Sequence, residues 1–222
     1  MNVNPIFRLI KFFKEKDELH AKNLIEKGQI YFNLPSQYND SKSEQYGDSN
    51  EGAEWIDNSQ ITNVKVESPT LGTFDLKPSP DYPSKLVQYN DYYLIYSIYQ
   101  ITYSNIETES SFQIDKRMLE WKFGVVIEKP YDFLRSIITE IKNQKIKYEA
   151  RAVSYIDLSN NRIDHLTPFD KKSEHQHQNE FRIILENTDN LTKSIEIGSI
   201  KMYAKLVTTE SILKPWRFEQ SI

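Results

Sequence analysis

A chain of 222 residues with 38% hydrophobic and 13% aromatic residues can bury a core, which excludes an intrinsically disordered protein. A formal charge of −4 gives no case for broad nucleic-acid attraction, although it is compatible with a local basic face. The absence of cysteine excludes disulfides, thiolate zinc sites and cysteine catalysis. No apolar run approaches the ~20 residues of a membrane span, and the N-terminus lacks a secretory pattern, so we expect no membrane association and a cytoplasmic protein.

The first apolar stretch, residues 6–13, predicts a central strand because apolar side chains occupy both of its alternating faces. Strict alternation places Arg8 and Ile6 on one face of this strand and Phe7 on the other. Arg8 is the exception on an otherwise apolar face. It is therefore a candidate for binding a phosphate through its guanidinium group.

A helix and a second strand are expected to follow. Asp17 is placed to cap a helix that carries Leu19 among its apolar residues, and Gly28 supplies the left-handed residue at which the helix ends. Residues 29–34 then predict a short strand. The N-terminal part of the chain thus predicts the order strand, helix, strand.

Residues 36–59 predict a long polar loop that contains six acidic side chains. A loop of this length within a compact domain is typical of a functional or a disordered segment. Its candidate ligand-binding residues are Asn39, Asp40, Asp48 and Glu51. The acids can serve as oxygen ligands for Mg²⁺ or the loop as a lid, and the alternative is a solvated loop. Because the spacing fits no EF-hand, no metal is assigned.

The rest of the chain predicts more strands than helices. Helices are expected at residues 115–121 and from Pro130 onward, where an apolar stripe recurs at helical spacing. Strands are expected at residues 61–67, 92–103, 123–127, 148–156, 180–185, 194–197 and 202–208. We therefore predict a single α+β domain over residues 1–222, with a mixed, mostly antiparallel sheet, two main helices and long irregular loops.

The stretch Asn179–Leu185 carries the main candidate site. On a strand, Glu180 and Arg182 share one face with Ile184, so their charges lie side by side and can pair or converge on a ligand. One interpretation is a structural ion pair on a sheet. The other makes Glu180 a catalytic carboxylate and Arg182, or Arg8, a phosphate-binding group.

Weaker signals surround this stretch. The polar side chains of Tyr31, Asn33 and Ser97 lie near expected strand ends, where they can line a ligand pocket. His175 and His177 would diverge on a helix and share a face on a strand, but no third metal ligand is identifiable. No phosphate-binding loop, dinucleotide fingerprint, nucleophile elbow or HExxH pattern is present.

Two stretches of the sequence resemble a broad family of small bacterial and phage proteins of unknown function. The first runs from Gly28-Gln29-Ile30-Tyr31-Phe32-Asn33-Leu34-Pro35 to Tyr38-Asn39-Asp40, and the second is Asn179-Glu180-Phe181-Arg182-Ile183-Ile184. The family combines an N-terminal "GxIyFNxPxxyND" stretch with a C-terminal "NEFRII" strand. This chain departs from it after Asn39-Asp40, where Ser41 replaces an immediate proline.

The order of elements is also similar to the NAD-binding core of ADP-ribosyltransferases. In that superfamily an arginine or histidine of an early strand holds NAD, and a glutamate of a late strand bonds the ribose hydroxyl and stabilises an oxocarbenium-like transition state. The likeness implies that Arg8 holds the cofactor and that Glu180 is catalytic. The middle-strand hydroxyl motif has a loose counterpart at Tyr96-Ser97.

These patterns lead to one main hypothesis and two alternatives. The main one is a protein of phage or bacterial conflict that binds a nucleotide or nucleic-acid-like ligand around Arg8, Glu180 and Arg182, with NAD as cofactor if it is a transferase. A second is a metal-dependent nuclease that uses Asp48, Glu51 and Glu180. The third is a non-catalytic inhibitor of a host or phage macromolecule. The sequence leaves the partner and the oligomeric state open.

Overall fold

The computed structural model describes residues 5–39, 48–58, 64–70, 72–76, 86–107, 111–159, 162–187, 189 and 191–217. The predicted α+β class, with mostly antiparallel sheet and two main helices, is confirmed. Of the helices in the described ranges, none combines the length and apolar character that a membrane crossing requires. The helices are α1 (Glu18–Lys27), α2 (Ser36–Asn39), α3 (Tyr103–Glu107), α4 (Pro130–Asn143), α5 (Thr209–Ile212), and the 3-10 helices η1 (Glu15–Asp17), η2 (Lys116–Glu120) and η3 (Ser173–Gln178).

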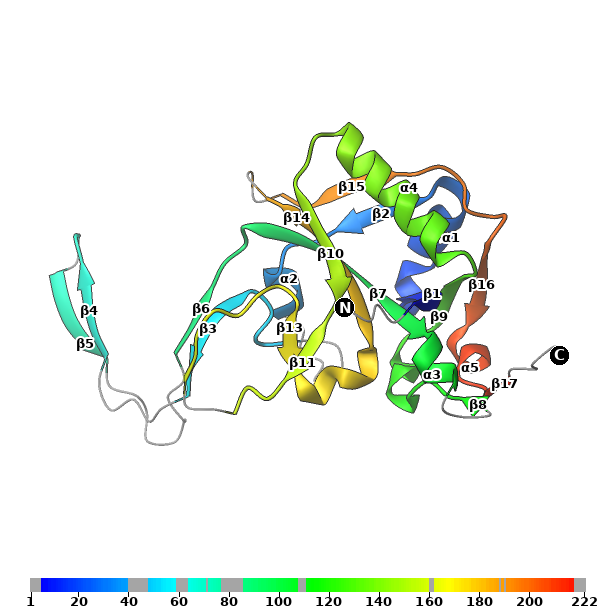
Figure 1. Cartoon of the computed structure of the whole chain (residues 1–222). Coiled ribbons are helices and arrows are strands. Elements are labelled where there is room, and N and C mark those ends of the chain that lie inside the picture. The colour runs from blue at the N-terminus through cyan, green and yellow to red at the C-terminus, as the bar shows by residue number, and fades with distance from the viewer. Residues whose placement is uncertain are drawn as a thin grey trace.

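A six-stranded antiparallel sheet forms the body of the molecule, in the order β10-β14-β7-β1-β9-β16 (Figure 1). Its strands are β1 (Ile6–Phe13), β7 (Tyr93–Thr102), β9 (Phe123–Ile127), β10 (Tyr148–Ala152), β14 (Glu180–Glu186) and β16 (Ala204–Thr208). The expectation that residues 6–13 form a central strand is confirmed, because β1 lies between β7 and β9.

Smaller sheets surround this body. Most of their pairs are antiparallel, and β11 pairs with β13 in parallel. In Figure 1 the β4–β5 hairpin stands apart from the rest of the described chain. The strands are β2 (Gln29–Phe32), β3 (Ala53–Asp57), β4 (Val64–Ser68), β5 (Gly72–Leu76), β6 (Leu86–Tyr89), β8 (Ser111–Phe112), β11 (Ser154–Ile156), β12 (Arg162–Ile163), β13 (Asp170–Lys172), β15 (Lys193–Glu196) and β17 (Trp216–Arg217).

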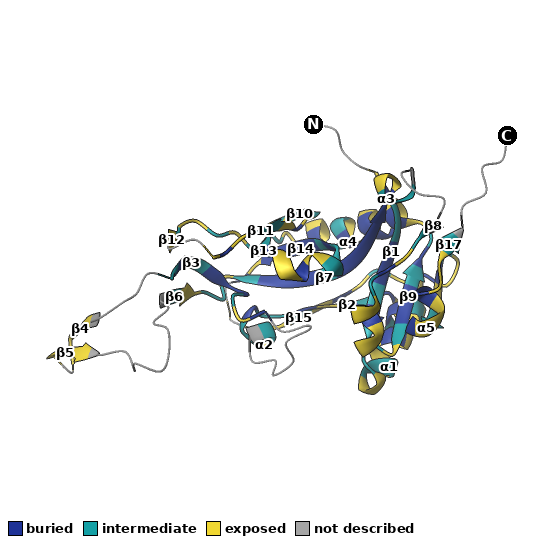
Figure 2. Ribbon diagram, turned by 90° about the horizontal axis from the view of Figure 1, so that it is seen from below, coloured by how far each residue is buried: buried dark blue, intermediate teal, exposed yellow. Residues whose placement is uncertain are grey.

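The main sheet buries both of its faces, and its central strand β7 is dark along most of its length in Figure 2. Helices α1 and α4 cover one face, where Leu24 and Phe133 pack into the larger core cluster. The other face is covered by η2 and α5, which contribute Met118 and Ile212 to a second cluster. The apolar stripe predicted after Pro130 is thus confirmed as the buried face of α4.

A β-bulge in β1 changes which face of the sheet its first side chains occupy. Ile6 is paired with Thr102 and Arg8 with Ile101, so Phe7 is an extra residue opposite the partner strand. Ile6 consequently packs in the cluster beneath α1 and α4, and Phe7 packs against the opposite cluster. Ile6 and Phe7 thus lie on opposite faces, as alternation predicts, but the predicted faces are exchanged: Ile6 shares its cluster with Leu9, and Phe7 packs against the cluster of Ile10.

Helix α1 begins and ends where the sequence predicts, but the predicted N-cap hydrogen bond to the Asp17 side chain is not formed. Gly28 adopts φ 64° and its N–H binds the carbonyl groups of Asn23 and Leu24, as expected for a left-handed stop. Asp17 occupies the cap position without a side-chain hydrogen bond to the helix, and Leu19 is 66% exposed. The strand after Gly28 ends at Phe32, two residues earlier than predicted.

Two further expectations are corrected. The described parts of residues 36–59 contain α2, a turn at residues 48–52 and strand β3, so they are not one irregular loop. The strand expected at residues 148–156 is interrupted at Val153. Its first half pairs with β14 and its second half with β13, so the chain changes partners at that residue.

Candidate functional site

The candidate site lies where β1 and β7 separate. The last pair that joins these strands is Ile10 and Tyr99; beyond it β1 remains paired with β9, and β7 with β14. Further along β7, the backbone of Asn33 pairs with Ile95 at N–O distances of 3.0 and 2.8 Å. Along this edge of β7 the backbone partner therefore changes from β1 to Asn33, and Ser97 lies between the two pairings.

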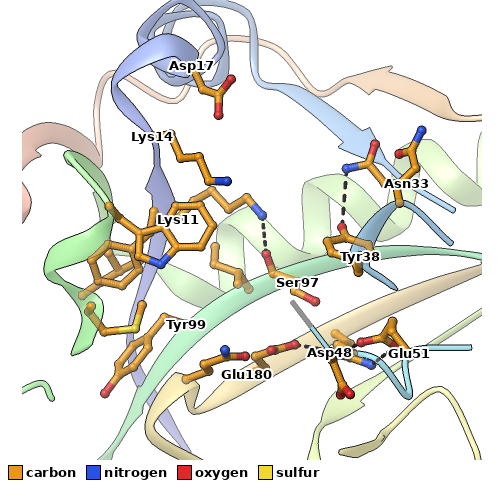
Figure 3. Close-up of a pocket in the computed structure, with 18 of the residues that line it drawn as sticks. Lys11, Lys14, Asp17, Asn33, Tyr38, Asp48, Glu51, Ser97, Tyr99 and Glu180 are labelled. Atoms are coloured by element: carbon orange, nitrogen blue, oxygen red, sulfur yellow. Dashed lines mark hydrogen bonds and ion pairs between the residues drawn. The ribbon is translucent and has the colours of Figure 1, made fainter. Parts of the chain in front are cut away.

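A cavity of about 430 Å³ fills this separation, and we call it the fork cavity (Figure 3). Its described lining includes many charged side chains. Five basic side chains line it, Lys11, Lys14, Lys16, Lys171 and Arg182, together with four acidic ones, Asp17, Asp48, Glu51 and Glu180. Four aromatic side chains complete the wall: Phe12, Tyr38, Tyr99 and Trp121.

Arg182 lines the cavity beside Glu51 and Glu180, and we call these three residues the floor; Arg182 is only 1% exposed. Two of its nitrogens bind the carboxylate of Glu51 at 2.8 and 2.6 Å, and its Nε donates to Glu180 at 2.8 Å. It also donates to the carbonyl oxygen of Pro168 at 2.5 Å. A buried guanidinium is stable only when its donors are paired in this way, so the network fixes the positions of all three charged groups.

Glu180 is held on both carboxylate oxygens. Oε1 accepts a hydrogen bond from Lys171 at 2.5 Å, and Oε2 accepts the bond from Arg182. Burial alone would raise the pKa of Glu180, but the charges of Arg182 and Lys171 outweigh it and hold that pKa well below its usual range. The backbone N–H of Glu180 donates to the hydroxyl of Tyr155 at 2.8 Å. Glu180 is therefore an ionised, rigidly positioned carboxylate.

The turn at residues 48–52 carries Glu51 to Arg182. The N–H of Glu51 binds the carbonyl of Asp48 at 2.8 Å, and the Asp48 carboxylate accepts the N–H of Asn50 at 2.9 Å. Gly52 follows with φ 83°, and a Cβ there would lie 2.8 Å from the Cβ of Pro35. Burial raises the pKa of Glu51 above its ordinary value, against the opposing charge of Arg182.

Lys11 enters the cavity from the opposite side. Its Nζ donates to the carbonyl oxygen of Ser97 at 2.6 Å and lies 4.8 Å from the ring centre of Tyr96. Burial lowers the pKa of Lys11 to about 8, although the charge of Glu180 acts in the other direction. Lys11 thus bridges the separation between β1 and β7 (Figure 3).

The structure brings together most of the predicted site residues. Those that line the fork cavity are Asn33, Asp48, Glu51, Ser97, Glu180 and Arg182. The side-chain amide of Asn33 donates to the hydroxyl of Tyr38 at 3.4 Å. The shared face predicted for Glu180 and Arg182 is confirmed by their ion pair, with Ile183 and Leu185 buried in the opposite cluster.

The remaining predicted residues lie elsewhere. Arg8 is not in the cavity lining, since its guanidinium donates to the carbonyls of Phe7 and Glu128 at 2.9 and 3.3 Å; the expected convergence of Arg8 with Glu180 is therefore wrong. Tyr31 is partly exposed and packs edge-to-face on His20. Asn39 ends α2, and Asp40 lies outside the described residues.

Sequence reasoning missed Lys11, Lys171 and Trp121 as site residues. Lys171 begins the basic run that leads into β14, but nothing in the run distinguishes it from Lys172, which pairs with Glu174 at the surface. Lys11 shows one signal, a lysine on a strand with otherwise buried neighbours. Trp121 follows η2 and carries no local signal at all.

The metal interpretations gain no support within the described part of the chain. No three histidine, aspartate or glutamate side chains there are placed to share an ion. Glu51 and Glu180 both bind Arg182, which lies between them. His175 and His177 sit on η3 instead of a strand, with ring centres 6.4 Å apart. Glu51 and Glu180 therefore each pair with a cation of the protein itself.

Comparison with known protein families, curated proteins and solved structures finds no significant match for this chain. The site must therefore be interpreted from its own geometry.

Proposed function

We propose that the fork cavity binds a nucleotide, with its phosphates beside the lysines at the end of β1. The observation that supports this proposal is a group of basic side chains that line one cavity. Lys171 and Arg182 form ion pairs with Glu180 and Glu51. Lys11, Lys14 and Lys16, which we call the rim, line the same cavity from the end of β1 and from η1, and three amino groups in one wall suit a phosphate.

Aromatic side chains next to these lysines suit a nucleotide base. Trp121 and Tyr99 both line the cavity, and the Nζ of Lys14 lies 5.8 Å from the ring centre of Trp121. Stacking of a base on an aromatic side chain contributes about 1–3 kcal/mol, and a cation beside the ring is placed for the adjoining phosphate. The volume of about 430 Å³ is within the usual range of small-molecule sites.

The reaction we propose for this cavity is ADP-ribosyl transfer from NAD, with Glu180 as its catalytic carboxylate. The bond between ribose carbon and nicotinamide nitrogen breaks, nicotinamide leaves with the electron pair, and positive charge develops on the ribose. An acceptor nucleophile then bonds to the same carbon and loses its proton. Support comes from Glu180, an ionised carboxylate that lines the cavity and is held by two cations. A fixed carboxylate beside developing positive charge lowers the barrier.

This proposal sets the protein in the cytoplasm, where NAD and nucleotides are present, and in phage or bacterial conflict, where modification of a macromolecule can stop a competitor. Lys14 and Trp121 would then hold the donor nucleotide, and the acceptor would approach from the open side of the cavity.

The test is incubation with labelled NAD and cell lysate. We expect label transfer or NAD loss with the wild type and with Glu186→Gln, which changes an exposed carboxylate on the same strand. Glu180→Gln should reduce the rate by about 10²-fold or more while it still binds NAD. If no variant turns over NAD but nucleotide binds, only the transferase proposal fails. If nothing binds and one stoichiometric partner is captured, the protein is a non-catalytic interaction protein.

A further inference from the structure

Two of the lysines that line the fork cavity, Lys171 and Lys11, lie in very different surroundings. Lys171 forms an ion pair with Glu180 at 2.5 Å and a second hydrogen bond with Gln178 at 2.6 Å. Lys11 forms no ion pair with a carboxylate of the described chain, and its amine donates to the uncharged carbonyl of Ser97. Lys171 is therefore paired with a carboxylate, whereas Lys11 is half-buried in the cavity wall and has no ion pair with a described carboxylate.

We propose that Lys11 is a nucleophilic lysine that forms an imine with a phosphate-bearing aldehyde or ketone in the fork cavity. This activity goes beyond the proposed nucleotide function, because it needs the cavity and Lys11 but neither NAD nor Glu180 as a catalyst.

The geometry of Lys11 suits this role. The bond to Ser97 O uses one N–H and fixes the end of the side chain at the separation of β1 and β7, so the nitrogen is presented to the cavity. The Tyr96 ring lies 4.8 Å from the amine. A lysine without an ion-pair partner in the wall of a ligand-sized cavity suits the role of an imine-forming residue.

The charged and titratable groups around the cavity determine how readily Lys11 loses its proton. The segments that contribute such groups to the lining are the end of β1 with η1, α2, the turn at residues 48–52, β7, β13 and β14. In chain order the groups are Lys14, Lys16, Asp17, Tyr38, Asp48, Glu51, Tyr99, Lys171, Glu180 and Arg182. Of these, Glu180 is the one whose charge raises the pKa of Lys11, and burial outweighs it. Near neutral pH the neutral fraction of this amine is then larger than that of an ordinary lysine.

The chemical step is balanced without any external oxidant or reductant. The lone pair of the neutral Nζ attacks the carbonyl carbon, whose oxygen takes a proton and becomes a hydroxyl group. The nitrogen then loses its second proton as the hydroxyl leaves as water, which gives the imine. Lys14 and Lys16 on the rim are placed to bind the phosphate of the same ligand.

Labelling with pyridoxal 5′-phosphate tests the proposal on the full chain. This probe carries both an aldehyde and a phosphate, and borohydride converts its imine into a stable secondary amine that mass spectrometry assigns to a residue. We expect Lys11 to react about tenfold faster than exposed lysines such as Lys22, with a pH midpoint near 8. Pyridoxal without phosphate should react more slowly at Lys11, and excess inorganic phosphate should slow the phosphorylated probe.

Matched variants separate the outcomes. Lys11→Arg keeps a cation that can bind Ser97 O and should lose the fast labelling, whereas Lys22→Arg should keep it. The proposal is overturned if Lys11 reacts no faster than Lys22 in the wild type, or if its labelling shows no midpoint near pH 8. Because these rates are measured in the wild-type chain, the test stands even if Lys11→Arg does not fold. NAD turnover without Lys11 labelling would overturn this proposal alone.

Discussion

Glu51 and Arg182 lie 131 positions apart in the sequence and form a bidentate ion pair in the floor of the fork cavity, with nitrogen–oxygen distances of 2.8 and 2.6 Å. Both side chains are almost fully buried, so the pair connects the turn at residues 48–52 to β14 away from water. We expect Glu51→Gln to lower the free energy of unfolding by about 3 kcal/mol, because it leaves part of the Arg182 charge unpaired in a buried site.

Urea unfolding at neutral pH measures this change. Glu186→Gln is the matched control, since Glu186 pairs with Lys147 at 3.1 Å at the surface of the same strand, and its loss should cost less than about 1 kcal/mol. Equal costs for the two variants would show that the Glu51–Arg182 pair does not stabilise the floor.

Among the glycines that the structure describes, Gly28 is expected to tolerate a side chain least. Its φ is +64°, and a Cβ there would lie 2.2 Å from the carbonyl oxygen of Gly198. Gly28→Ala should cost about 3 kcal/mol or more, as strain and a backbone clash combine. Gly198→Ala has a positive φ but open space, so thermal unfolding should show a cost of only about 1 kcal/mol. A cost for Gly28→Ala as small as that of Gly198→Ala would contradict the close approach.

Glu180 should make stability depend on acid pH. Its pKa is depressed in the folded state, so its contribution is present above the unfolded value of about 4.3 and is lost as the pH falls below it. The stability gap between wild type and Glu180→Gln should therefore shrink between about pH 5 and pH 3. Urea unfolding across this range measures it, and a constant gap would show that Glu180 is not ionised in the pair.

Lys11 should make stability depend on alkaline pH, with the same sign as Glu180. Its folded pKa of about 8 is below the ordinary 10.5, so between these values the unfolded chain binds more protons and stability rises with pH. Wild type should therefore gain stability relative to Lys11→Met between pH 8 and about pH 10. Chemical unfolding at several pH values measures the difference, with Lys22→Met as an exposed control that should show no trend. A flat difference for Lys11→Met would mean that Lys11 stays charged throughout.

The local pattern of the sequence predicts the strands that carry the site. Alternation in Asn179–Leu185 places Glu180 and Arg182 on one face, and apolar residues on both faces of β1 predict its central place. The left-handed stop at Gly28 is also visible in the sequence, because only glycine adopts that conformation at little cost. These features depend on neighbours close in the chain.

The cavity itself depends on contacts between segments that are far apart in the sequence, and no local sequence pattern predicts such contacts. Arg182 takes Glu51 as its partner from a stretch that looks like solvated loop, and Lys11 is enclosed only because β7 leaves β1 after Ile10. The bulge at Phe7 shows the same limit, since one inserted residue reverses the faces that alternation predicts.

The most direct test of the central claim is isothermal titration of NAD into the full chain, with two tryptophan variants. The chain has three tryptophans; Trp121 lines the fork cavity, and Trp55 binds Gln88 on β6 outside it. We predict saturable binding at one site per chain, weakened about tenfold or more in Trp121→Ala and unchanged in Trp55→Ala. Absence of saturable heat, or equal affinity in wild type and Trp121→Ala, would contradict nucleotide binding in this cavity.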